Sequence, residues 1–237
     1  MEAKTRFPSY KSLPAVALAI GLMAAAVPSH AAPSNAFFAY SPFGTQTLDL
    51  VTSSGSVSLT ATSAGWWTST GNHSSSNPNY IVGVCGSSDS CGGDNLDRRD
   101  FFIFDLSTVR DTILSASLNI GNSSSGYYST GSSVPLSFFD VFTSLTDVAA
   151  SGSGRVDIYN DLGAGSSYGS FNAQASDINT QVLIALNNTA VSALNDARGS
   201  SWAVGGSIAT SDIPEPGSLA LAGLSLAVLR AMRRRKV

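Results

Sequence analysis

Residues 101–106 read Phe-Phe-Ile-Phe-Asp-Leu, and residues 114–120 read Leu-Ser-Ala-Ser-Leu-Asn-Ile. The first run is apolar along almost its whole length, which is typical of a central strand covered on both faces. The second run alternates between apolar and polar residues, which predicts a strand with one buried face. The residues expected on that buried face are Leu114, Ala116, Leu118 and Ile120.

The chain around these two runs is rich in Ser, Thr, Gly and Asn, and turn residues break it roughly every eight to twelve positions. Further strands are expected at 37–40, 47–51, 57–62, 66–69, 80–84, 136–142, 156–159, 182–186 and 202–204. The residues assigned to one short helix are Thr189 as its cap, Val191, Leu194 and Ala197 on its inner face, and Gly199 at its end. Many short strands with one helix predict an all-β fold, a single jelly-roll-like β-sandwich over residues 32–210.

The residues between the two ends of the chain are acidic. Residues 32–212 contain five arginines, no lysine, 14 aspartates and no glutamate, so their formal charge is −9. No basic patch is interleaved with aromatic residues, and an acidic surface repels phosphate groups. We therefore expect no nucleic-acid partner.

Cys85 and Cys91 enclose the pentapeptide Gly-Ser-Ser-Asp-Ser. In an exported chain, two cysteines this close most simply form a disulfide that pins a loop before the strand at Phe101. Free thiols or a metal site are the alternatives, but a metal site would need further soft ligands, and none lies nearby in the sequence. We expect no metal and no cofactor.

Six charged residues gather in the segment 94–105. They are Asp94, Asp97, Asp100 and Asp105 with Arg98 and Arg99. The carboxylates either share a calcium ion with backbone carbonyls or pair with the arginines. Their spacing matches no EF-hand loop, and arginines in the same cluster oppose a tight cation site. Ion pairing and turn formation are therefore favoured.

No residues form a recognisable catalytic motif. His73 is the only histidine beyond the N-terminal segment, and no Gly-x-Ser-x-Gly elbow is present, so His73 is assigned to loop packing. A glycosidase needs two carboxylates that face each other across a cleft, and no motif selects such a pair. We expect a protein that is not an enzyme; the alternative is a secreted polysaccharide-active hydrolase that uses residues such as Asp97 or Asp100.

Three aromatic residues are candidate sugar contacts: Trp66, Trp67 and Tyr80. Strand alternation turns one of the adjacent tryptophans inward and the other outward. An exposed tryptophan can stack on sugar rings, although core packing explains these residues equally well.

The N-terminal residues 1–31 have the layout of a secretory signal peptide. Lys4, Arg6 and Lys11 precede an apolar run at 15–27, and Ser29-His30-Ala31 offers small residues to signal peptidase. A retained membrane helix is the alternative. The apolar run would rise only about 20 Å as a helix, which is short of the bilayer core.

The segment 213–237 has three parts. Pro214, Glu215 and Pro216 favour extended backbone. An apolar stretch follows and predicts a transmembrane helix at about 217–232. The basic residues at its far end are Arg230, Arg233, Arg234, Arg235 and Lys236. Positive residues stay in the cytoplasm, so the body of the protein is expected outside.

This order of Pro-Glu-Pro, apolar helix and basic cluster resembles the PEP-CTERM sorting signal. The resemblance implies a substrate of exosortase, a membrane-embedded protease or transpeptidase of Gram-negative bacteria. It also implies membrane anchoring before processing and delivery to the cell surface or the exopolysaccharide matrix, with extracellular polysaccharide as a candidate ligand. An ordinary single-pass anchor that is never cleaved is the alternative.

Three further segments resemble known extracellular modules. Residues 101–107 followed by 113–120 are similar to a run in bacterial extracellular β-sandwich modules, and 159–169 and 202–206 resemble parts of PEP-CTERM passenger domains. The resemblance implies an exported structural or adhesive protein. It supports architecture more than activity, because the same sandwich carries unrelated functions.

Overall fold

A computed structural model describes residues 36–39, 46–86, 93–129 and 131–208. The chain divides into two units, Met1–His30 and Ala31–Val237, and all described residues belong to the second unit. The signal peptide expected at 1–31 and the membrane helix expected at 217–232 lie outside the described residues. Within the described part, no helix is long and apolar enough to cross a membrane.

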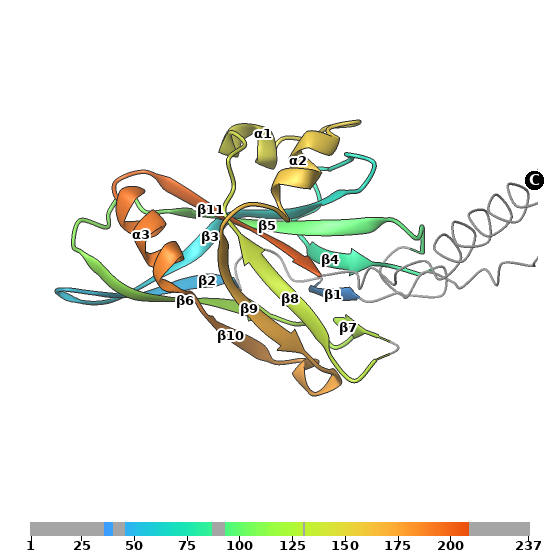
Figure 1. The fold of residues 1–237 in the computed structure, drawn as a ribbon, viewed down its shortest axis with the longest axis horizontal. Coiled ribbons are helices and arrows are strands. Elements are labelled where there is room, and N and C mark those ends of the chain that lie inside the picture. Colours follow the sequence, from blue (N-terminus) through green and yellow to red (C-terminus); the bar gives the residue numbers. More distant parts are fainter. Residues whose placement is uncertain (1–35, 40–45, 87–92, 130, 209–237) are drawn as a thin grey trace, which may run out of the picture. The chain divides into compact units, whose positions relative to one another are not determined.

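The described strands form one antiparallel sheet (Figure 1). They are β1 (Ala36–Ala39), β2 (Thr47–Thr52), β3 (Gly55–Thr68), β4 (Tyr80–Val84), β5 (Asp97–Asp105), β6 (Ile113–Gly121), β7 (Tyr127–Tyr128), β8 (Val134–Phe139), β9 (Ser167–Ala173), β10 (Gln181–Ala185) and β11 (Ser201–Ile208). The helices are α1 (Leu145–Ala149), α2 (Val156–Asp161) and α3 (Asn188–Asp196), with a 3-10 turn at Ala175–Asp177. The prediction of a mostly β protein with few helices is confirmed.

The sheet runs in the order β10-β6-β2-β3-β5-β11-β8-β9, and β4 pairs with β5 and β1 beside this path. Its two edges return to each other next to α3. The Asn187 backbone amide donates to the Tyr168 carbonyl at 2.8 Å, and the Asn187 side chain donates to the Ser167 carbonyl at 2.7 Å. The sheet is therefore nearly closed, and the finer jelly-roll assignment stays a prediction.

Strand β3 joins the two halves of the sheet. Its first half pairs with β2, and its second half pairs with β5 after a register shift between Ala61 and Ser63. The sequence predicted two strands here, at 57–62 and 66–69. The structure has one bent strand, because a local irregularity in pairing turns the strand without ending it.

Strand β5 is covered on both faces, as its apolar sequence predicts. Phe102 and Phe104 lie in the main core enclosed by the sheet, and Phe101 and Ile103 lie in a second cluster with residues of α1 and α2. Figure 1 shows α1 and α2 on one side of β5, and β6 and β10 on the other. Burying both faces of one strand makes it the centre of the fold.

One expectation about β6 is wrong. Ala116, Leu118 and Ile120 are buried, but Leu114 is 61% exposed and Ile113 is buried in its place. The pairing with β2 shifts after Val51, so that Leu114 has no partner across the strands. A bulge inserts one residue and thereby reverses the side-chain alternation beyond it.

The predicted strand at 156–159 is instead helix α2. Ile158, Tyr159 and the capping Leu162 are buried against Trp67 and Phe101. Ile158 and Leu162 are four residues apart, so a helix turns both toward the sheet, whereas a short alternating pattern cannot separate strand from helix here.

Helix α3 is the helix predicted from the sequence, with a different start. Asn187 caps it by accepting a hydrogen bond from the Ala190 amide at 3.0 Å, and Thr189 lies inside the first turn. Leu194 is buried and Val191 and Ala197 are partly buried against the core. The chain leaves the helix through Gly199, whose φ of +81° suits glycine.

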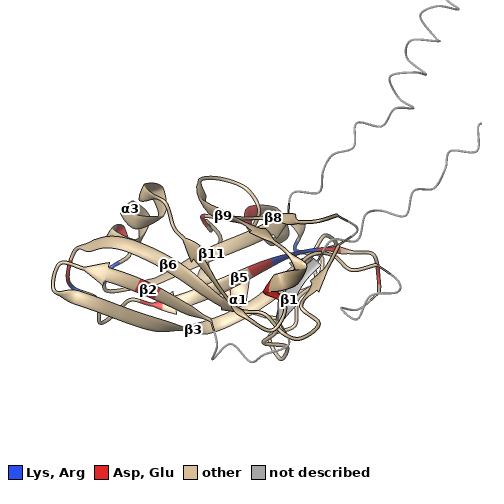
Figure 2. Ribbon diagram, turned by 90° about the horizontal axis from the view of Figure 1, so that it is seen from below, with Lys and Arg blue, Asp and Glu red and all other residues tan. Residues whose placement is uncertain are grey.

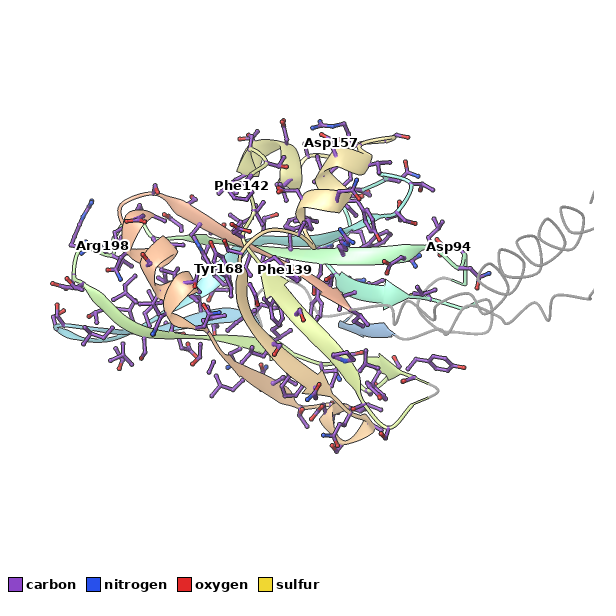
Figure 3. All side chains as sticks on the ribbon, viewed as in Figure 1. Asp94, Phe139, Phe142, Asp157, Tyr168 and Arg198 are labelled. Atoms are coloured by element: carbon purple, nitrogen blue, oxygen red, sulfur yellow. The ribbon has the colours of Figure 1, made fainter. Side chains whose placement is uncertain are left out.

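Several strand boundaries also differ. β8 ends at Phe139 rather than 142, and Phe142 is 78% exposed in the following loop (Figure 3). β11 continues through Gly205 and Gly206 to Ile208, since β5 and β8 pair with it on both sides. Strands β7 and β9 were not expected at all.

Candidate functional site

The first half of β5 gathers most of the candidate residues. Trp66 lies opposite Asp100 and Trp67 lies opposite Arg99 across the β3–β5 pair. Asp94 lies in the segment that leads into β5 (Figure 3). The sequence candidates from both segments therefore do meet in space.

Arg98 is held inside the protein by several contacts. Its guanidinium pairs with Asp94 at 2.7 Å, donates to the Leu96 carbonyl at 2.9 Å, and lies 4.9 Å from the ring centre of Trp66. Only 3% of the Arg98 side chain is exposed. Charge pairing and cation–π contact compensate for removing the guanidinium from water. The expected ion pairing is confirmed for Asp94.

Asp105 has the expected turn role. Its carboxylate accepts from the Ser107 amide at 2.8 Å, and this hydrogen bond lowers the pKa of Asp105. Its side chain hence stabilises the turn that leaves β5. Within the described residues, no three His, Cys, Asp or Glu side chains lie close enough together to hold a metal ion.

Arg99 and Asp97 attach helix α2 to the sheet. The Arg99 guanidinium lies 4.3 Å from the ring centre of Tyr159 and donates to the carbonyls of Tyr159 and Asn160 at 3.0 and 2.9 Å. The Tyr159 hydroxyl donates to Asp97. Burial, reinforced by Asp97, raises the pKa of Tyr159. The role of Tyr159 was not predicted from the sequence, because Tyr159 lies 60 positions from Arg99 and 62 from Asp97, and no local pattern links them.

Asp100 has the most unusual environment. It is fully buried, and neither carboxylate oxygen has a hydrogen-bond partner. Burial raises the pKa of Asp100 to about 8, so the side chain is protonated at neutral pH. The expectation of a charge-paired carboxylate is wrong for Asp100, since Arg98 bonds to Asp94 instead.

The three candidate sugar contacts do not form an exposed platform. Trp67 is 1% exposed and its indole N–H donates to the Val148 carbonyl at 2.9 Å. Tyr80 is 0% exposed and its hydroxyl donates to the Gly121 carbonyl at 2.9 Å. The assignment of Trp67 and Tyr80 as sugar contacts is therefore wrong, because both side chains are buried and a sugar chain outside the fold cannot reach them. Trp66 is half-buried and faces the Arg98 guanidinium.

His73 packs in a loop, as assigned. Its ring lies 5.1 Å from that of Trp67 and 5.4 Å from that of Phe101, and its Nδ1 is 2.9 Å from the Trp66 carbonyl oxygen. Burial lowers the pKa of His73. These contacts join His73 to two aromatic rings and a backbone carbonyl, so the ring has the surroundings of a core residue.

Cys85 is disulfide-bonded and fully buried. Its carbonyl accepts from the Asn95 amide at 2.9 Å, which ties the end of β4 to the segment before β5. Cys91 lies outside the described residues.

The proposed processing residues, Pro214 to Pro216, and the basic residues 230–236 also lie outside the described part. Residues 212–236 match the family model of the PEP-CTERM protein-sorting motif. This match covers the predicted segment 213–237 almost residue for residue. No curated protein and no solved structure matches the chain.

The matched motif indicates how the protein is exported and processed. A PEP-CTERM signal implies export and membrane anchoring, followed by processing by the membrane protein exosortase. The chain is therefore a PEP-CTERM protein, an exosortase substrate that is sorted to the cell surface.

Proposed function

We propose that the sorted protein is a structural or adhesive component of the cell surface or exopolysaccharide matrix of a Gram-negative bacterium, and that it is not an enzyme. The observation that carries this proposal is the sorting motif at 212–236. A motif of this kind sets the destination of the chain, and the described residues then supply an acidic β domain at that destination.

The positions of the catalytic candidates support the same proposal. Asp97 and Asp100 are three residues apart on one strand, so alternation turns them to opposite faces of the sheet. Asp97 contacts Tyr159, whereas Asp100 is buried among core residues. Two carboxylates on opposite faces cannot act on one sugar between them, which disfavours the hydrolase alternative.

The sorting step is tested by the mass of the released protein. In the native host, we expect the protein released from the surface to end between Ile213 and Gly217, and a strain without exosortase to retain the protein at the membrane. The double variant Pro214→Ala/Pro216→Ala should also be retained, whereas the neighbouring Ser218→Ala should be released normally. Released protein that carries the whole tail through Val237 would contradict processing.

The absence of enzymatic activity is tested separately. The purified protein is incubated with the host's own polysaccharide, and new reducing ends are measured. We expect none above the blank. Turnover that disappears in Asp97→Asn or Asp100→Asn would establish the hydrolase instead.

A further inference from the structure

One part of the outer surface of the sheet, formed by β10, β6, β2 and the first half of β3, has no described helix over it. Helices α1 and α2 cover β3 and β5 on their outer face, where Trp67, Phe101 and Ile103 are apolar. The outer face of β10, β6, β2 and the first half of β3 carries mostly short polar side chains, with Leu183 and Val51 as exposed apolar residues among them. Figure 2 shows these strands almost free of charge colours, while blue and red gather on β5.

This uncovered face contains a groove of about 310 Å³ that lies along β2. Two cross-strand rows form it. Asp49 lies between Ser58 of β3 and Ser117 of β6, and Val51 lies between Ser56 and Ser115. Neighbouring strands are about 4.8 Å apart and same-face residues about 6.8 Å apart along a strand, so the six side chains make a regular array.

The array has the chemistry of a carbohydrate site. The Asp49 carboxylate accepts hydrogen bonds from Ser58 and Thr47, and both bonds use the same oxygen, Oδ1. This arrangement leaves Oδ2 as a strong acceptor for hydroxyl groups. Serine hydroxyls both donate and accept, as sugar hydroxyls do, and Val51 is 46% exposed beside them as a contact for C–H groups.

The charge of the groove limits the chemical class of its ligand. Among the described residues, no arginine or lysine lines the groove, and Asp49 is its only charged residue. Residues 32–212 carry a formal charge of −9, so uronates, sulfated sugars and phosphates are repelled. β2 is also bonded to β3 and β6 on both sides, so the groove offers no free strand edge for a peptide.

We propose that the groove formed by Asp49, Val51 and the serines at 56, 58, 115 and 117 binds a chain of neutral sugar residues. The inference rests on the proposed function, because it supplies the contact by which the sorted protein holds an uncharged polysaccharide. The groove is shallow and has no aromatic side chain, so each contact is weak, with Kd on the order of 1 mM, and retention in a matrix depends on many copies.

Affinity electrophoresis tests the inference with the full chain in a zwitterionic detergent that carries no sugar. Dextran and hydroxyethylcellulose in the gel are the neutral probes, and alginate is the anionic probe. We expect a neutral probe to slow the protein. The double variant Ser56→Lys/Ser115→Lys fills the groove, and Asp49→Asn removes its carboxylate. Each should weaken retardation on the order of tenfold.

The matched control is Thr60→Lys/Gln181→Lys. Both residues are exposed on the same outer face but outside the groove, and the charge change is identical. The control should show the same relative retardation as the parent protein, where each variant's mobility is divided by its own mobility in a gel without polysaccharide. Thermal unfolding of all three variants shows whether a lost interaction reflects a lost fold.

Three outcomes would overturn the inference. They are equal retardation of the groove and control variants, no retardation by either neutral probe, and retardation by alginate alone. A dimer in light scattering that Ser56→Lys/Ser115→Lys dissociates would assign the face to a second copy of the chain instead.

Surface display is measured on the same variants. If display persists while glycan binding is absent, only the groove assignment fails, whereas loss of sorting in the parent protein would fail the proposed function.

Discussion

Asp97 and Asp100 are three residues apart in the sequence but lie on opposite faces of β5. Asp97 accepts a hydrogen bond from Tyr159, and Asp100 is buried without a hydrogen-bond partner. The alternation of the strand alone separates two carboxylates that look equivalent in the sequence. One of them attaches a helix to the sheet. The other places an acid in an apolar core, and this placement has consequences for stability.

Asp100 should make the protein less stable as the pH rises. The pKa of Asp100 is raised from 3.8 to about 8 in the folded protein, so between about pH 4 and pH 8 the folded state holds a proton that the unfolded state has lost. The free energy of unfolding should therefore decrease through this window, by on the order of 5 kcal/mol, and level off above pH 8.

Urea unfolding of Asp100→Asn at several pH values checks this effect. The variant removes the titrating group, so its stability should change much less between pH 4 and pH 8. Asp105→Asn is the control, because Asp105 is exposed and should leave the slope of the parent protein in place. An unchanged slope in Asp100→Asn would contradict a raised pKa at this position.

Gly206 should not tolerate a larger residue. A Cβ at this position would collide with Oδ1 of Asp100 and lie 3.3 Å from the Phe138 ring. Overpacking of this kind in a core typically costs 1–3 kcal/mol, so we expect Gly206→Ala to lower stability by about 3 kcal/mol in urea unfolding. Gly131→Ala is the control, since its nearest atoms are at 3.6 Å or more. Equal stability of both variants would show that the core yields around Asp100.

Tyr159→Phe should loosen α2. The variant removes the hydroxyl that donates to Asp97 and keeps the ring under the Arg99 guanidinium. A hydrogen bond to a charged group contributes about 1.5–3 kcal/mol, and we expect a loss near the lower value because the site is partly exposed. Hydrogen exchange should rise in residues 156–162 first. Tyr128→Phe, at an exposed tyrosine, should alter neither quantity.

The bulge in β6 should separate two leucines that the sequence pattern treats alike. Leu118 is fully buried, so Leu118→Ala should cost about 3 kcal/mol in urea unfolding. Leu114 is 61% exposed, so Leu114→Ala should stay within about 0.5 kcal/mol of the parent protein. Similar losses from the two variants would mean that the strand pairs in the uninterrupted register.

The sorting segment could be identified from the sequence because its signal is local. The order of Pro214-Glu215-Pro216, an apolar stretch and a basic cluster depends on neighbouring residues alone, and the family match at 212–236 agrees with it. The central role of 101–106 was also readable, since a strand buried on both faces must be apolar on both. The same holds for the Asp105 turn, whose partner Ser107 is two residues away.

What tertiary structure alone decided is which side chains meet across long separations. The burial of Tyr80, the contact of Arg99 with Tyr159, and the isolation of Asp100 depend on strand register and on helix α2, which a short stretch of sequence does not encode. The bulge at Leu114 is of the same kind, because one unpaired residue reverses every side chain beyond it. Local composition thus determined the destination and the all-β character of the chain, and long-range pairing determined which of its polar residues remain accessible to a ligand.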